Sequence, residues 1–395
     1  LAVLAVGVFA FLMQRLLYTQ QGLEFALAQL KHVQTARIEV RGARGVIAGA
    51  LNFDRVVVDH AAVRVEADDV SGTPAFFGLL SGRLTVGNAS VGRVEVLIKD
   101  RGPQPETQIH FLPAWLSIMA PDAVVRRAGV TLKTGQRLHA ESVRGDLRMT
   151  RWRIDVDPVV VEDPAGRVTG NVYLRGTLPL GLRGEVSGRW RLPDERTYRF
   201  SARVKGKLDR LGIDASLTEP ARLAFSGTGL DLNHEARAVG TLRAVEFDGS
   251  PWIPAGRLPL VSGSLSVDAR LDAIGVSGTL TSPMFGPEQL RVRGSGKYAE
   301  SVLDVVSLRA WMPRSGLAVS TAGTVRFAEH APVLDLKGDW TRFRWPLAGD
   351  AFVESVSGKY SLGGALPYAF ELTAQAVGPQ IPAARFNAAG STDRQ

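Results

Sequence analysis

The chain has 395 residues with 45% hydrophobic, 22% charged and 7% aromatic side chains, and it contains 42 glycines and no cysteine. The lack of cysteine excludes a disulfide framework, a thiolate zinc site and a cysteine nucleophile, and the apolar fraction excludes a disordered chain. The net charge of +8 is compatible with binding to nucleic acid or to an anionic membrane surface. The distribution of the charges along the chain distinguishes between these partners.

An uncharged apolar run covers residues 1–13 and leads into Gln14 and Arg15. As a helix this run extends about 20 Å, short of the ~30 Å hydrocarbon core of a bilayer, and no small-x-small cleavage site follows it. We predict an uncleaved transmembrane anchor over 1–20, with a cleaved signal peptide and a buried core helix as the alternatives. The residues expected to face lipid in this anchor are Leu4, Val8, Phe9, Phe11 and Leu12.

A short amphipathic helix is predicted over residues 21–32, because its leucines recur on one helical face. From residue 36 the pattern changes to period two, as in Val63–Asp68 and Arg199–Lys205. Successive side chains of a strand point to opposite faces, so each segment has one apolar face and one charged or hydroxylated face. Residues 111–119 are the exception, where a short helix is expected.

The predicted fold class is therefore mainly β. An N-terminal transmembrane helix is followed over residues 33–395 by a long, twisted, half-open antiparallel β-groove with an apolar interior. The arginines are spread along the polar faces of the strands and interleaved with acidic residues. That distribution is typical of a solvated face that protects strand edges, and it argues against nucleic acid as a partner.

An internal repeat is marked by the pattern glycine-x-apolar-x-apolar. It begins at Gly170, Gly263 and Gly358, at spacings of 93 and 95 residues, and a fainter copy begins at Gly82. Chance alignment of amphipathic strands would explain any single match, whereas the near-constant spacing favours a repeat unit of several strands. Such units cannot bury an apolar face alone, but they can stack edge to edge into one long sheet.

The apolar faces of these strands consist mainly of Val, Leu and Ala, which would line a space rather than fill it. A closed sandwich is the alternative, and the residues alone leave the two equal. An open apolar face of this size would be a binding surface, and an acyl chain is its natural occupant. The residues predicted to line it are Val63, Val65, Leu84, Val86, Val94, Val96, Val172, Leu174, Leu265, Val267, Leu271, Tyr360 and Leu362.

One segment near the end of the chain carries a more specific pattern. Residues 338–347 read GDWTRFRWPL, and a Ser-Gly-Lys-Tyr strand begins at Ser357. With softer matches at residues 19–23, 42–49 and 79–86, the chain resembles the N-terminal portion of the TamB family of AsmA-like, bridge-like lipid transfer proteins.

The resemblance implies a single-pass protein of the bacterial inner membrane whose body lies in the periplasm. It implies a β-groove that carries phospholipid acyl chains from the inner toward the outer membrane. It also implies outer-membrane protein assembly with the Omp85-family protein TamA, through a C-terminal region that this chain does not contain. The alternative function is a scaffold for outer-membrane protein insertion without lipid transport.

No pattern in the sequence points to catalysis, to a metal or to a cofactor. The six histidines are scattered, and Gly294-Ser295-Gly296-Lys297 resembles a phosphate loop but has Arg291 where the first glycine is required. The carboxylate pair Asp155 and Asp157 could bind Ca²⁺ or act as acid and base. Its place on a polar strand face favours solvated charge. A secreted polysaccharide enzyme is the weakest alternative, and we predict that the protein is not an enzyme.

Overall fold

A computed structural model describes residues 18–21, 23–24, 37–59, 63–75, 78, 81–98, 111–131, 137–176, 179–191, 196–230, 236–248, 260–270, 272–299, 301–327, 332–347, 353–365, 367–378 and 381–391. The chain forms two compact units, residues 1–188 and residues 189–395, and each is described by itself. The described residues are mainly β-strand, as the period-two pattern predicts.

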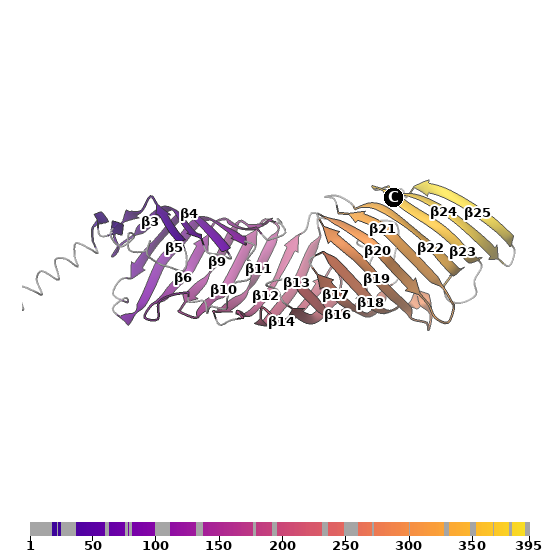
Figure 1. Ribbon diagram of the computed structural model, residues 1–395, viewed down its shortest axis with the longest axis horizontal. Helices are drawn as coiled ribbons and strands as arrows, with labels where there is room; N and C mark the ends of the chain where they lie inside the picture. Colours follow the sequence, from indigo (N-terminus) through magenta and orange to yellow (C-terminus); the bar gives the residue numbers. More distant parts are fainter. Residues whose placement is uncertain are drawn as a thin grey trace, which may run out of the picture. The chain divides into compact units, whose positions relative to one another are not determined.

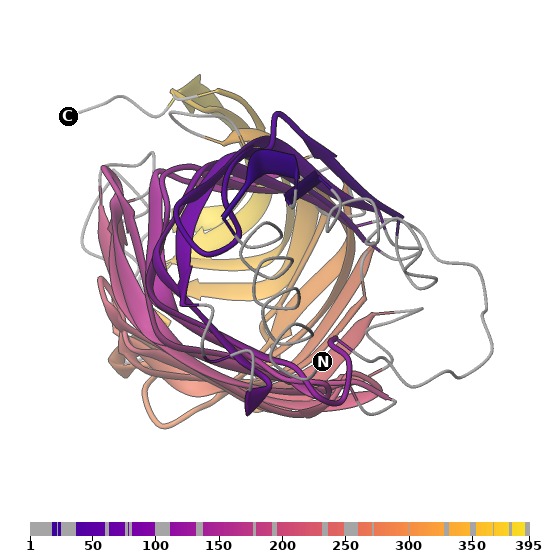
Figure 2. The ribbon, with the colours of Figure 1, turned by 90° about the vertical axis from the view of Figure 1, so that its left-hand side faces the viewer.

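The described part of the first unit contains eleven complete strands and most of a twelfth, which ends beyond the unit boundary. They are β1 (Arg37–Arg41), β2 (Arg44–Gly45), β3 (Leu51–Asp59), β4 (Val63–Ala75), β5 (Arg83–Ile98), β6 (Ser117–Val125), β7 (Ala128–Thr131), β8 (Arg137–Ala140), β9 (Ser142–Met149), β10 (Arg153–Asp163), β11 (Gly166–Arg175) and β12 (Gly181–Arg191). In Figure 2 the strands of this unit, coloured indigo to magenta, form a strongly bent sheet rather than a flat one.

The sheet of the first unit is mixed. Most of its strand pairs are antiparallel, as the sequence predicts, and β5 forms parallel pairs with β6 and β7. Strand β5 pairs antiparallel with β4 on one side, and on the other side it pairs parallel with β6 and then with β7. A parallel pair requires a connection that returns to the starting end of the first strand, and residues 99–116 supply the necessary length. The sheet continues from β6 through β9 and β10 to β11 by antiparallel pairing.

The short helix predicted over residues 111–119 is wrong. This segment contains a turn in which the Leu116 N–H donates to the Pro113 carbonyl (3.1 Å), and β6 begins at Ser117. A nine-residue apolar segment does not distinguish helix from strand by periodicity. Pairing of Ser117–Met119 with Arg83–Thr85 of β5 decides in favour of the strand.

Among the described residues, no helix is long and apolar enough to cross a bilayer. This finding contradicts the predicted fold class with its N-terminal transmembrane helix, and it contradicts the predicted single-pass inner-membrane localisation. The apolar run is itself shorter than a hydrocarbon core as a helix. The expected lipid-facing residues Leu4, Val8, Phe9, Phe11 and Leu12 lie outside the described residues. Helical backbone is present at 20–21 and 23–24, and the rest of the helix predicted over 21–32 lies outside the described residues.

The second unit contains thirteen complete strands and one short 3-10 helix, η3 (Pro283–Phe285), among its described residues. The strands are β13 (Thr197–Lys207), β14 (Arg210–Glu219), β15 (Leu223–Leu230), β16 (Arg237–Phe247), β17 (Val261–Arg270), β18 (Ala273–Thr281), β19 (Leu290–Ala299), β20 (Val302–Trp311), β21 (Ala318–Arg326), β22 (Val333–Trp345), β23 (Val353–Gly364), β24 (Ala369–Gly378) and β25 (Ile381–Ser391).

These strands form a simple meander in which each strand from β13 to β25 pairs antiparallel with the next. Strands β17 to β25 therefore lie side by side in chain order (Figure 1). Consecutive strands are thus also neighbours in the sheet, which is the arrangement that the alternating pattern predicts.

The repeat found in the sequence corresponds to six strands. Gly170 lies in β11, Gly263 in β17 and Gly358 in β23, and the fainter copy at Gly82 immediately precedes β5. A repeat of roughly 94 residues is therefore six strands long. The three clear copies therefore lie on every sixth strand, namely β11, β17 and β23.

The tightly packed part of the second unit is small. Met312 and Leu317 are buried where β20 turns into β21, and the Met312 N–H donates to the Leu317 carbonyl (2.9 Å). The Glu288 carboxylate accepts hydrogen bonds from the backbone N–H groups of Arg314 and Ser315 in the same turn. These contacts fix the turn between β20 and β21 at the ends of the two strands.

Candidate functional site

One face of the second unit carries no charged side chain along three successive rows of opposed residues. Residues directly opposite each other in neighbouring strands point to the same face of a sheet, so the register of the strands defines these rows. We call their members the apolar face. The first row is Leu242, Leu265, Gly278, Val292, Ala310, Val319, Trp340, Gly358, Ala374 and Phe386; the second is Gly240, Val267, Val276, Gly294, Leu308, Thr321, Gly338, Tyr360, Leu372 and Ala388; the third is Ala238, Ala269, Ile274, Gly296, Val305, Gly323, Leu336, Leu362, Phe370 and Gly390.

Among the described residues of the second unit, no second layer covers the apolar face. Ile274 and Leu308 are each 37% exposed and Phe386 is 42% exposed. Residues between the two sheets of a sandwich would be buried, because side chains from both inner faces interdigitate. Within the described part of the second unit, these side chains therefore remain accessible to a ligand.

The apolar face is hollowed where β21 to β25 meet, at a cavity of ≈ 650 Å³. This volume lies in the range of pockets that hold small ligands, about 300–1,000 Å³. The lining is apolar apart from two hydroxyl side chains. It consists of Val319, Trp340, Phe343, Val353, Ser355, Tyr360, Leu372, Ala374, Ala376, Val377 and Phe386.

Trp340 is the central side chain of this cavity and is buried. Its ring stacks on Tyr360 with centroids 6.2 Å apart, and it meets Phe343 edge-on at 6.2 Å. The indole Nε1–H donates to the Ser355 hydroxyl (3.0 Å), which in turn donates to the Ser357 carbonyl (3.1 Å). The buried N–H is thus satisfied, and the ring is held flat against the sheet with no polar group aimed into the cavity.

Glycines beneath the aromatic rings make this arrangement possible. A Cβ atom at Gly358 would lie 2.0 Å from the ring of Trp340, and one at Gly338 would lie 2.6 Å from the ring of Tyr360. Each ring therefore covers a glycine of the neighbouring strand, as aromatic side chains do when they shield glycines in sheets. The hollow in the apolar face depends on these two missing side chains as much as on the aromatic ones.

The predicted lining residues of the second unit fall on this face. Leu265 belongs to the first row, Val267 and Tyr360 to the second, and Leu362 to the third. Tyr360 also lines the cavity, and its hydroxyl is hydrogen-bonded to that of Thr321. Leu271 lies outside the described residues.

The predicted residues of the first unit form two groups along its strands. A row runs through Leu84, Ile118, Met149, Ile154 and Leu174, and the next positions along these strands add Val86 and Val172. Val172 is 37% exposed. These four predicted residues therefore share an apolar face of the first unit.

Val65, Val94 and Val96 lie farther along β4 and β5, beyond two irregularities in the pairing of these strands. The register shifts by one residue near Asn88, which has a positive φ of 49°, and the pairing skips Asp69, which has a positive φ of 54°. Each irregularity interrupts the alternation of faces, so the parity of the residue numbers does not relate Leu84 to Val94. Val63 pairs with Ile98 in this ladder, and its side chain lies outside the described residues.

The sequence did not identify the residues that shape the cavity around Trp340. Trp340 and Phe343 lie in the tryptophan-proline segment that carries the family resemblance, and no local pattern marks Val319, Leu372 or Phe386 as their neighbours. Their proximity comes from the pairing of five strands. The one available signal was the concentration of aromatic residues in 338–347.

The polar face of the second unit carries ion pairs between neighbouring strands. The Arg237 guanidinium donates to both oxygens of Asp268, with an Nε–Oδ1 distance of 2.8 Å. This hydrogen bond lowers the pKa of Asp268, and Asp268 in turn raises the pKa of Arg237. Both side chains are exposed, so the interaction is weakened by solvent.

We expect Asp268→Asn to reduce the stability of the protein slightly at pH 7 and not at all at low pH. Because the pKa of Asp268 is lowered in the folded state, its contribution is present above the unfolded pKa of about 3.9 and is lost as the pH falls through the folded pKa. Urea unfolding of both proteins at pH 7 and below pH 3 would measure this. A difference that persists at the lower pH would contradict the assignment.

The residues considered for chemistry are held in structural contacts. Asp155 is buried and pairs with Arg153, and the Tyr173 hydroxyl donates to Asp157. Asp155 is thus less solvated than the sequence suggested. The Gly294–Lys297 run lies within β19, and no group of His, Cys, Asp or Glu among the described residues could hold a metal ion.

Comparison of the chain with protein-family models, with curated proteins and with solved structures found no significant match. The resemblance to the TamB family therefore stays a prediction from the sequence.

Proposed function

We propose that the protein binds lipid acyl chains along the apolar face of its second unit, and that the cavity around Trp340 is the best-defined binding site on this face. The observation that supports this most strongly is the uncharged face that runs without interruption from β16 to β25 and remains partly exposed. A soluble protein rarely leaves such a continuous apolar surface uncovered unless it binds something there.

The energetics favour an acyl chain over a polar ligand. Each methylene group removed from water contributes about 0.8 kcal/mol, so a 16-carbon chain gains on the order of 10 kcal/mol from full burial. The cavity offers a polar ligand two hydroxyls, and its lining contains no carboxylate, histidine, lysine or arginine side chain. Buried polar atoms of such a ligand would lose their hydrogen bonds to water without replacement.

The family resemblance suggests phospholipids as the source of these acyl chains and outward lipid transport as their use. The expected partnership with TamA rests on the resemblance alone. The exposed apolar face supports the acyl-chain part of the proposal, and it applies equally to any lipid with a saturated or unsaturated chain.

Photo-crosslinking at adjacent residues of one strand, which point to opposite faces of the sheet, tests this function. A photoreactive amino acid at Leu265 or Leu362, both on the apolar face, is expected to capture lipid from cells that express the full chain. The same group at the adjacent positions Ser266 and Ser361, on the polar face, is expected to capture little. Equal lipid capture at both faces, or capture of client proteins without lipid at the apolar positions, would overturn the proposal.

A further inference from the structure

Two arginines lie directly opposite each other on the polar face of the second unit. Arg293 of β19 pairs in register with Arg309 of β20, so their Cα atoms are about 4.5–5.5 Å apart. Like charges in directly opposed positions destabilise a sheet. Such a pair is therefore an unfavourable choice unless something else occupies the space between the two side chains.

These arginines differ from others on the polar strand faces. Arg55, Arg93 and Arg237 each form an ion pair with a carboxylate. No carboxylate of the described residues forms an ion pair with Arg293 or Arg309. The guanidinium carbon of Arg309 lies 5.7 Å from the centroid of the Trp311 ring, a contact that orients the group without neutralising it.

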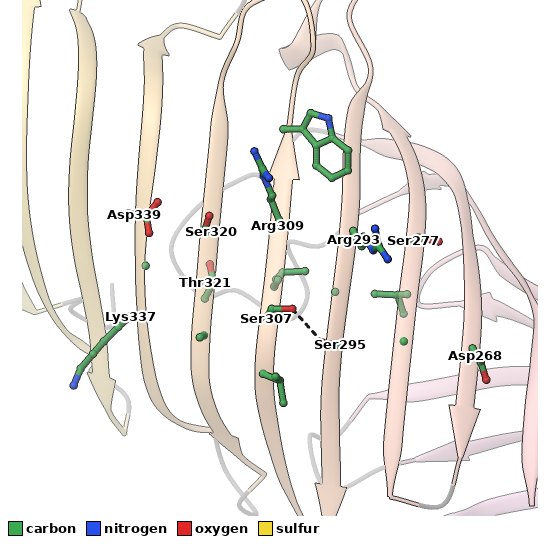
Figure 3. Close-up of a pocket in the computed structure, with 18 of the residues that line it drawn as sticks. Asp268, Ser277, Arg293, Ser295, Ser307, Arg309, Ser320, Thr321, Lys337 and Asp339 are labelled. Carbon is green, nitrogen blue, oxygen red and sulfur yellow. Dashed lines mark hydrogen bonds between the residues drawn. The ribbon is translucent and has the colours of Figure 1, made fainter.

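The arginine pair lies in a broad concavity of ≈ 1110 Å³ that is lined largely by polar side chains. Four serines flank the pair. Ser277 lies opposite Arg293 and Ser320 lies opposite Arg309 in the two outer strands, whereas Ser295 and Ser307 lie two residues from the arginines in the strands that carry them. The hydroxyls of Ser295 and Ser307 are hydrogen-bonded to each other (3.1 Å). Figure 3 shows Ser277, Arg293, Arg309, Ser320 and Asp339 in one row across five neighbouring strands.

The acidic residues of the concavity do not cancel the arginine pair. Asp268 is already bound by Arg237, and Asp339 lies directly opposite Lys359. Lys337 adds a further positive charge to the lining. The centre of the concavity therefore presents two guanidinium groups and several hydroxyl donors, with the nearest acidic side chains already opposed by cations.

We propose that Arg293 and Arg309 form a binding site for a phosphate-type oxyanion. Arginine presents paired N–H donors that match two oxygens of a phosphate, and serine hydroxyls can donate to the remaining oxygens. A bound anion would also remove the repulsion between the two arginines. The site is on the opposite side of the sheet from the apolar face, so it is independent of the proposed acyl-chain binding.

The test measures thermal unfolding of the full chain with increasing inorganic phosphate, against chloride at matched ionic strength. Phosphate is expected to raise the melting temperature of the wild-type protein by a few degrees in a saturable manner. The double variant Arg293→Gln/Arg309→Gln is expected to lose this response and to be at least as stable as the wild type without phosphate, because the repulsion is gone. Arg326→Gln, on the same face of β21 with Val302 and Val333 as its register partners, is the control for one lost charge.

A second arm identifies the source of the phosphate. Flotation with phosphatidylglycerol vesicles, compared with phosphatidylcholine vesicles, measures binding to an anionic lipid headgroup. Binding to phosphatidylglycerol that the double variant loses would identify a headgroup as the ligand, whereas a response to inorganic phosphate alone would identify a free phosphate. The proposal is overturned if the double variant and the wild type respond identically in both arms.

Discussion

Leu372→Asp is expected to reduce the affinity of the protein for a fluorescent fatty acid by at least about tenfold, which corresponds to about 1.4 kcal/mol. Leu372 lines the cavity around Trp340 and lies opposite Tyr360 in the second row of the apolar face. A carboxylate at this position would have to be buried against the acyl chain or be neutralised, and either change is unfavourable. Fluorescence titration of the purified chain measures the effect.

The matched control is Thr373→Asp. Thr373 is the next residue of β24, faces the other side of the sheet and lies opposite Lys359, so the new carboxylate would gain a cation as its neighbour. Both variants change the net charge equally and both place Asp in the middle of the same strand. Equal affinities in the two variants, with both proteins folded by circular dichroism, would show that the cavity does not bind the acyl chain.

The faces of the second unit were predictable because its topology is local. Every strand from β13 to β25 pairs with its sequence neighbour, so alternation assigns faces across the stretches that contain no register shift. It does not do so across the shifts, such as the one between Val305 and Leu308. Leu265, Val267, Tyr360 and Leu362 were placed on one side by this argument, and the register agrees.

The first unit was less predictable because its pairing is not local. Parallel pairing of β5 with β6 and β7 depends on a long connection, which periodicity does not reveal. The register shift near Asn88 was a missed signal. Asn is among the residues that most readily adopt a positive φ, and Gly87-Asn88 interrupts an otherwise alternating strand.

Neither candidate site could be identified without the register of the strands, because the residues of each site are far apart in the sequence. Trp340 and Ser355 are 15 residues apart, and Arg293 and Arg309 are 16 residues apart. In the sequence each arginine is one of many on a polar face, and the tryptophan is one of seven. Only the pairing of strands shows that the arginines oppose each other and that the indole covers a glycine.

Gly358→Leu is expected to destabilise the protein by about 1–3 kcal/mol, the usual cost of forcing extra volume into a packed position. The new Cβ atom would overlap the Trp340 ring, which is 2.0 Å from that position. The ring would have to leave the sheet and break the hydrogen bond between its Nε1–H and Ser355. Urea unfolding followed by tryptophan fluorescence measures both the loss of stability and the change in the surroundings of the indole.

Gly363→Leu in the same strand separates this effect from the general effect of adding a leucine to β23. A Cβ atom at Gly363 would lie 3.8 Å from the Leu334 carbonyl oxygen, an ordinary contact, so the change in stability is expected to stay within about 0.5 kcal/mol. Gly358→Leu should also weaken fatty-acid binding, because a displaced indole would occupy the cavity, whereas Gly363→Leu should not. If both variants unfold at the same urea concentration as the wild type, Trp340 is not held over Gly358, and the cavity described on the apolar face does not exist in solution.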